Sequence, residues 1–239
     1  MPEKIIYIDG IGNVLLKRSN RARYLNISVK PFVGARVSVP VGVSYKSAAE
    51  FATVKKNWLK QNLDKMQELE KMQTQYDENS GYCTKHHQLI LRKGDRKNIS
   101  VRLLKGKINI VYPAELNPKL KEVQTAIRIG IERALKIEAK EYLPHKVKKL
   151  AAEFGFIYNK LSLKNIKSRW GSCSGKSNIN LSIHLMRLPE HLIDYVILHE
   201  LVHTVHHNHS ASYWSALDKV TDGAKRLDKE LRKYRIAIY

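Results

Sequence analysis

The chain has 239 residues, of which 43% are hydrophobic and 27% charged, and this excludes an intrinsically disordered chain while allowing one large domain or two modest ones. No stretch approaches the roughly 18 to 20 uncharged apolar residues that cross a bilayer. The first residues lack a signal-peptide pattern, and two cysteines are too few for a disulfide framework. We therefore expect a cytoplasmic protein without a membrane partner, and the formal net charge of +21 favours non-specific nucleic acid as a possible partner.

The N-terminal part, residues 1–117, is predicted to be a β-rich region with one long helix. Short apolar or β-branched runs separated by turn-like segments predict strands within residues 1–45 and again within 87–113. Between them, apolar residues at three- and four-residue steps predict a helix over about 48–72. No internal repeat or low-complexity tract is evident in the sequence.

The C-terminal part, residues 118–239, is predicted to be mostly helical with a small sheet, which makes the whole chain an α+β protein. The expected elements, in chain order, are a helix over about 118–154, a strand over 160–166, a turn-rich segment over 169–177, a strand over 178–185, a helix from 190 to about 207 and a last helix from near Ser210. Pro144 is expected to kink the first helix or to begin a new one. We expect the strand over 178–185 to pair with an extended peptide.

The strongest chemical motif is an HExxH formed by His199, Glu200 and His203. Residues four apart on a helix lie on one face, which lets two imidazoles bind one cation at the short distance that zinc requires. The glutamate next to the first histidine need not bind the metal, but it reaches a water molecule held there and can take its proton. The motif predicts a zinc site with Glu200 as the general base.

A catalytic zinc usually has three protein ligands and one open position. His209 is the favoured third ligand, provided that the helix ends and the chain turns back, and Asn208 is suitably placed to end it. His206 would have to converge on the metal across two helical turns, so His206 and His207 are expected beside the site or on the surface. Acidic residues further along the chain remain the alternative third ligands: Asp218, Asp222, Asp228 and Glu230.

The segment SRWGSCSGKSNINLSIHLMRLPEHLIDYVILHELVHTVHHNHSASYW (168–214) resembles the YgjP-like metallopeptidase domain family of predicted metal-dependent hydrolases, as do VSVPVGVS (37–44) and NWLK (57–60). The chain is similar, more distantly, to SprT-like and Spartan-type proteases. This resemblance implies a compact zincin-like catalytic core, zinc ligands at His199, His203 and His209, and Glu200 as catalytic acid/base. The spacing from His199 to His209 is also that of the metzincin peptidases, but those place glycine where this chain has His206 and carry a later methionine turn that is missing here.

Two further residues are candidates for contact with the substrate. Arg169 would hold a substrate carboxylate or stabilise the oxyanion, or alternatively brace a turn against the motif helix. Tyr213 is a candidate oxyanion donor because it follows His209 by four residues, while Cys173 is expected to be a small buried residue rather than a fourth ligand. The sequence thus predicts a zinc metallopeptidase with a peptide or protein substrate; the alternative is a nucleic-acid-associated protease or a basic nucleic-acid-binding protein with a zinc site.

Overall fold

The computed structural model describes residues 3–236 and has the predicted α+β composition. The chain forms two compact units, one that runs to Thr74 and one that begins at Gln75. The boundary predicted between residues 117 and 118 falls inside the second unit, so a functional division at that point stays a prediction. No helix within residues 3–236 is both long enough and apolar enough to cross a membrane, and the cytoplasmic location stays a prediction.

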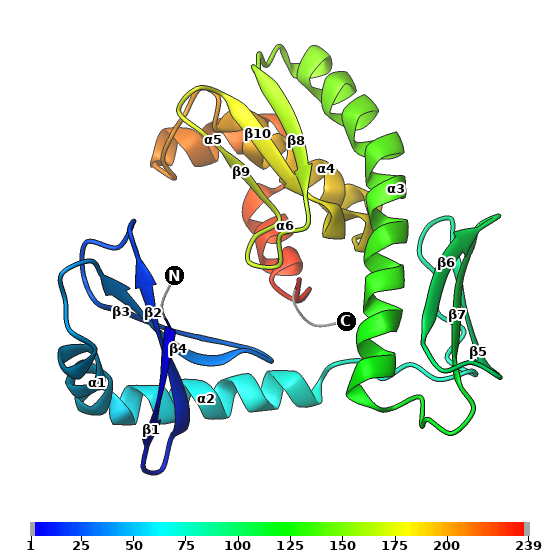
Figure 1. Ribbon diagram of the computed structural model, residues 1–239. Coiled ribbons are helices and arrows are strands. Elements are labelled where there is room, and N and C mark those ends of the chain that lie inside the picture. Colours follow the sequence, from blue (N-terminus) through cyan, green and yellow to red (C-terminus); the bar gives the residue numbers. More distant parts are fainter. Residues whose placement is uncertain (1–2, 237–239) are drawn as a thin grey trace. The chain divides into compact units, whose positions relative to one another are not determined.

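The first unit is a four-stranded sheet with two helices (Figure 1). Its elements are β1 (Glu3–Ile8), β2 (Gly12–Ser19), β3 (Asn26–Lys30), β4 (Gly34–Pro40), α1 (Tyr45–Val54) and α2 (Lys56–Lys71). The strands are ordered β1-β2-β4-β3, with β2 parallel to β4 and the other neighbours antiparallel. Alternate residues of β2 and β4 are buried together with one side of each helix, and this apolar layer is the core of the unit.

The single helix predicted over 48–72 is in fact two helices. The backbone of Lys55 has φ −91° and ψ 18°, which is not helical, and its N–H bonds the carbonyl of Phe51. Ser44 caps α1 by accepting a hydrogen bond from the N–H of Ser47. Because Ala52 of α1 and Leu59 of α2 are both buried in the same core, the break lets both helices pack on the sheet.

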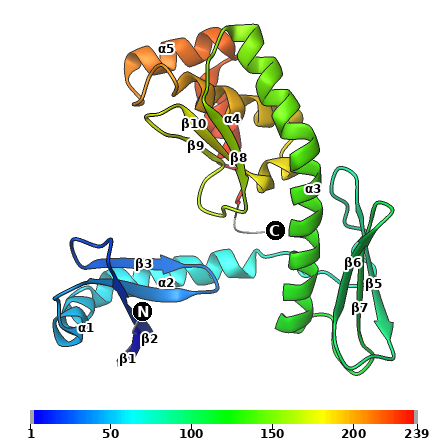
Figure 2. The ribbon, with the colours of Figure 1, turned by 45° about the horizontal axis from the view of Figure 1, so that its top comes forward.

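The second unit holds two three-stranded sheets around one long helix (Figures 1 and 2). Its elements are β5 (Gln88–Gly94), β6 (Ser100–Leu104), β7 (Lys107–Pro113), α3 (Lys121–Phe154), β8 (Lys160–Lys164), β9 (Gly171–Cys173), β10 (Asn178–Ser182), the 3₁₀ helix η1 (Ile183–Arg187), α4 (Glu190–Val202), α5 (Ala211–Val220) and α6 (Ala224–Leu231). One part of α3 packs on the sheet β5-β7-β6, and another packs on η1, α4 and β8. Pro144 lies inside α3 and therefore does not begin a new helix.

The sheet β8-β10-β9 corrects the sequence analysis in two places. Residues 171–173, expected in a turn, form the short strand β9, which pairs antiparallel with β10. Strand β10 also pairs in parallel with β8, so both of its edges are occupied. The prediction that the strand over 178–185 pairs with an extended peptide is therefore wrong, because the edge strand on that side of the sheet is β9.

The structure also reveals an internal repeat that the sequence analysis missed. Strands β2-β4-β3 and β5-β7-β6 have the same order and directions, and each set is followed by a helix that packs on it. The registers agree as well: Leu16 pairs with Val37 and Leu91 with Ile110, and three residues further along each first strand the partners are Pro40 and Pro113. Strands β4 and β7 bury the same alternate positions. The repeat lies in strand pairing and burial, with few identical residues, so a sequence scan overlooks it.

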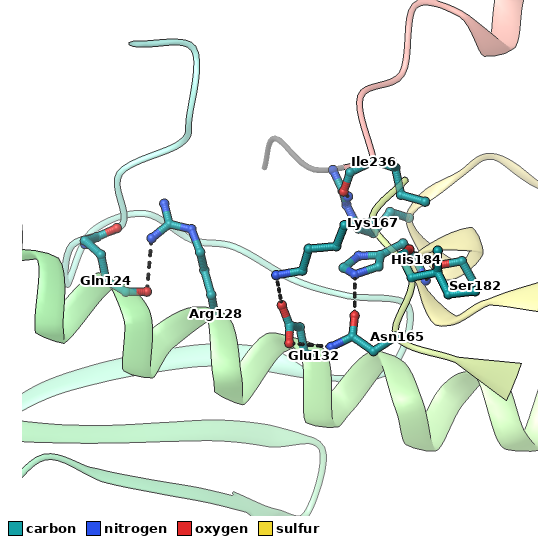
Figure 3. A network of polar contacts seen from close by, with 10 residues as sticks. Gln124, Arg128, Glu132, Asn165, Lys167, Ser182, His184 and Ile236 are labelled. Carbon is teal, nitrogen blue, oxygen red and sulfur yellow. Dashed lines mark hydrogen bonds and ion pairs between the residues drawn. The ribbon is translucent and has the colours of Figure 1, made fainter. Parts of the chain in front are cut away.

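A polar network joins η1 to α3 through the buried side chain of His184 (Figure 3). Asn165 Nδ2 donates to Glu132 Oε2 at 2.7 Å, so Asn165 Oδ1 is the acceptor that faces His184 Nε2 at 2.9 Å. The ring nitrogen Nε2 of His184 therefore carries the hydrogen. Burial lowers the pKa of His184 to about 4, which keeps the ring neutral at neutral pH.

This buried histidine predicts a loss of stability in mild acid. Since the pKa of His184 lies below its ordinary value of 6.5, the unfolded chain binds a proton that the folded chain refuses, and stability falls as the pH drops below 6.5. Between about pH 7.5 and pH 5 we expect a loss of roughly 2 kcal/mol from this residue. Urea unfolding of wild type and His184→Gln at both pH values measures it: the wild type should lose more stability than the variant. Equal losses would contradict the prediction.

Candidate active site

Helix α4 places the HExxH motif at its C-terminal end. Pro189 precedes the first turn, and the apolar residues of the helix, among them Leu198, Leu201 and Val202, are buried against the rest of the unit. His199 lies in the last turn, and His203 is the residue that ends the helix. The side chains four residues apart thus face the same side, as the sequence predicted for a helical motif.

Helix α4 ends at Val202, six residues before Asn208, the residue that was expected to end it. After Val202 the chain forms a tight turn, in which the hydroxyl of Thr204 donates to the carbonyl of Leu201 at 2.8 Å. The ring of His203 closes the turn, because its Nδ1 bonds the carbonyl of His206 at 2.9 Å. This early end brings the following residues back toward the last turn of α4.

The turn brings His209 to the two histidines of the motif. The ligand atoms of His199, His203 and His209 all lie within 4.8 Å of one another. Nε2 of His199 and Nε2 of His209 are 3.3 Å apart. Within residues 3–236 this is the only group of three or more histidine, cysteine or acidic side chains close enough to hold a metal ion.

The alternative third ligands have other contacts. Asp218 accepts a hydrogen bond from the N–H of Ala224, and Glu230 contacts His191 at 2.7 Å. Asp222 and Asp228 each pair with an arginine four residues further along the chain. His206 supplies its backbone carbonyl to the turn, and His207 lines the cavity described below.

Burial keeps the motif histidines in their neutral form. Desolvation, helped by the neighbouring His203 and His209, lowers the pKa of His199 to about 3. Desolvation also lowers the pKa of His203, although its bond to the carbonyl of His206 acts in the opposite direction. Neutral imidazole is the form that binds metals, so the environment favours metal ligation over protonation.

Glu200 is almost completely buried, with 5% of its surface exposed. Desolvation raises the pKa of its carboxyl group to about 8, and the positive charge of Arg169 partly opposes that rise. The carboxylate lies directly against the backbone of β9, where a Cβ on Gly171 would lie 2.5 Å from Glu200 Oε1. Because Gly171 has no Cβ, it leaves room for the Glu200 side chain. This role of Gly171 was not predicted from the sequence. The only sequence signal was a glycine within the turn-rich segment 169–177.

These groups share one open cavity of about 520 Å³. Its lining comprises Glu200, the three histidines of the group and His207, together with the segment around β9. The residues are Ser168, Arg169, Gly171, Ser172, Cys173, Gly175, His199, Glu200, His203, His207 and His209. Arg169 therefore lies in the cavity with Glu200, as its proposed contact with substrate requires. Cys173 also lines the cavity but is not part of the histidine group, and burial raises the pKa of its thiol.

Tyr213 of α5 packs against the three histidines. It is fully buried, and its ring stacks on that of His203 with centroids 4.5 Å apart. Its hydroxyl donates to the backbone carbonyl of His199 at 3.3 Å, and the residue does not line the cavity. The predicted role of Tyr213 as an oxyanion donor stays a prediction, and it would require the hydroxyl to leave this bond.

Comparison with known proteins points to one family. The model of the family described as YgjP-like, metallopeptidase domain, matches residues 23–234, which confirms the predicted resemblance. Two solved structures of metallopeptidase zymogens are similar to parts of the chain. For abylysin of Pyrococcus abyssi the identity is 22% over 40% of this chain and 98% of that one, with a TM-score of 0.35. For jannalysin of Methanocaldococcus jannaschii the identity is 18% over 38% and 93%, with a TM-score of 0.34. No curated protein matches.

Proposed function

The chain belongs to the YgjP-like metallopeptidase family, and from this premise we propose that it is a zinc-dependent peptidase in which Glu200 is the general base. One observation carries the proposal: three histidine ligand atoms lie within 4.8 Å of one another in a cavity that also holds a buried glutamate. The sheet β8-β10-β9 with α4 is, in this proposal, a zincin-like catalytic core.

The histidine group fits zinc. Two nitrogen ligands at 2.0–2.1 Å from a tetrahedral zinc lie about 3.3 Å apart, and the Nε2 atoms of His199 and His209 are 3.3 Å apart. The bond from His203 Nδ1 to the carbonyl of His206 leaves Nε2 of that ring for the metal, as in many sites where a carbonyl orients a histidine ligand. Imidazole ligands suit zinc, and no fourth ligand joins the group within residues 3–236, which favours an open catalytic site.

When bound, zinc polarises the scissile carbonyl and lowers the pKa of water. Glu200 takes the proton from the attacking water and passes it to the leaving amine. For this it must be ionised, and the positive charge of Arg169 favours the ionised form against the effect of burial. Strand β9 is an edge strand of its sheet and lies beside Glu200, and there we expect an extended peptide to pair.

The nucleic-acid partner inferred from the charge of the chain stays a prediction. The positive residues are spread over both units, and no nucleic-acid-binding motif is evident in the sequence. Binding to DNA at low salt, with a steep loss as salt rises, would be the test of that partner.

The first experiment is zinc analysis of wild type beside His209→Ala, purified without chelator. We expect about one zinc per wild-type chain and clearly less in the variant, because two histidine ligands hold zinc more weakly than three. The wild type should also cleave members of a peptide library, and a chelator should stop the cleavage. Full zinc in His209→Ala would remove His209 from the site. A wild type that binds no zinc would refute the proposal.

A further inference from the structure

Arg169 is a cation in the cavity, and its charge acts on Glu200 without an ion pair between the two among residues 3–236. Its side chain lines the cavity together with Glu200 and is exposed to solvent. No described carboxylate forms an ion pair with it, whereas Arg226 and Arg232 of the same unit each pair with an aspartate. A guanidinium offers N–H groups in a planar fork that binds a carboxylate through two parallel hydrogen bonds. Arg169 can therefore bind an anionic group that enters the cavity.

The segment that leads to Arg169 is anchored to α3 (Figure 3). Glu132 accepts a hydrogen bond from Asn165 at 2.7 Å and pairs with Lys167 Nζ at 2.5 Å. The side chain of Glu132 is 18% exposed, which shields the ion pair from water more than a surface position would. The chain two residues before Arg169 is thus fixed to the long helix.

A second anchor fixes the same segment from the side of the small sheet. The hydroxyl of Ser182 donates to the carbonyl of Ile166 at 2.6 Å, and the N–H of Ser182 donates to the carbonyl of Trp170 at 2.8 Å. Ser182 itself is fully buried at the end of β10. These bonds flank Arg169 on both sides, so its backbone is held in place before any ligand arrives, which lowers the entropy cost of binding.

Arg169 and Glu200 line the same cavity. Arg169 precedes Gly171 by two residues, and Gly171 is in contact with Glu200. A peptide bound along β9 would therefore lie next to both Arg169 and the histidine group.

We propose that Arg169 is a specificity-determining residue that binds a carboxylate of the peptide substrate, and this rests on the proposed peptidase function. The carboxylate belongs either to an acidic side chain near the scissile bond or to the C-terminus of the peptide. A charge-assisted hydrogen bond at a partly exposed site predicts a preference of about tenfold for the acid over its amide.

Matched peptides test this preference. A set of fluorogenic decapeptides carries either glutamate or glutamine at one position on either side of the scissile bond, and each peptide is made with a C-terminal carboxylate and with a C-terminal amide. The ratio of kcat/KM for acid over amide should be about ten for one of these pairs. The position of that pair identifies the source as a side chain or a C-terminus. Ratios near one for every pair would overturn the proposal.

Variants of Arg169 test whether this residue causes the preference for the acid. Arg169→Met should bring the ratio to about one, and Arg169→Lys should keep only part of it, because lysine retains the charge without the fork. Lys176→Met is the matched control: it removes a nearby exposed positive charge that does not line the cavity, and the ratio should stay near ten. A ratio that survives in Arg169→Met, or falls equally in Lys176→Met, would refute a specific contact.

A binding measurement separates this inference from the proposed function. The Glu200→Gln variant, loaded with zinc, is titrated with the same acid and amide peptides, and bound peptide is followed by fluorescence anisotropy. Tighter binding of the acid, lost in Glu200→Gln with Arg169→Met, supports the contact even if no peptide is cleaved. Cleavage without an acid preference in rate or binding would instead leave the peptidase function standing and overturn the role of Arg169.

Discussion

Replacement of Glu200 by glutamine should lower the rate of peptide cleavage by about three orders of magnitude while one zinc stays bound. Glutamine has nearly the same shape as glutamate but cannot accept a proton at neutral pH, so the variant removes the base and little else. The three histidines that would hold the metal are untouched by this change. Cleavage of a library peptide, measured beside the zinc content of the same preparation, checks the prediction.

Glu190→Gln is the matched control for this experiment. Glu190 lies in the first turn of the same helix, and it bonds Lys146 at 2.7 Å, far along α4 from the motif. We expect its replacement to leave kcat/KM within about twofold of wild type, because a surface ion pair contributes little. If Glu200→Gln cleaved as fast as Glu190→Gln, Glu200 would not be the base.

Replacement of Gly171 by alanine should lower cleavage by about 100-fold without loss of zinc. The added Cβ would lie 2.5 Å from Oε1 and 2.7 Å from Cγ of Glu200, so the carboxylate must move. Glu200 is buried and has little room, and a displacement of about 1 Å of a catalytic group costs on the order of 100-fold in rate. The measurement is kcat/KM together with zinc content and the melting temperature.

Gly175→Ala is the control, since Gly175 follows in the same hairpin and a Cβ there meets nothing within 4 Å. Neither glycine has a positive φ, so alanine strains neither backbone, and the two variants differ in what the methyl group meets. Equal activity of Gly171→Ala and Gly175→Ala would show that the close approach of Glu200 to β9 does not matter for catalysis.

The sequence by itself predicted the features that depend on neighbouring residues. The spacing of His199 and His203 on one helix face is fixed by helical geometry, which is local and readable from letters alone. The same reasoning predicted the α+β composition, the long helix that became α3 and a helix from near Ser210 that became α5, because periodic apolar residues specify such elements. That helix was expected to be the last, but it ends at Val220 and α6 follows it. The pattern at 168–214 predicted the family that the comparison then confirmed.

Local sequence patterns gave wrong predictions where packing of the core determines the secondary structure. The periodicity over 48–72 runs on through Lys55, but burial of both Ala52 and Leu59 in one core is achieved by two helices. The internal repeat was missed because it is conserved as strand register and burial, with different side chains at equivalent positions.

Only the tertiary structure decided how distant segments meet. The approach of His209 to His199 depends on a turn that begins at His203. Asn208 was expected to end the helix, and it gave no sign that α4 ends earlier. Three further features depend on contacts between residues far apart in sequence. Strand β9 rather than β10 forms the sheet edge, Glu200 packs against Gly171, and Glu132 anchors the segment before Arg169. Such contacts form because the whole core must pack at once, and no local pattern specifies which partners will meet.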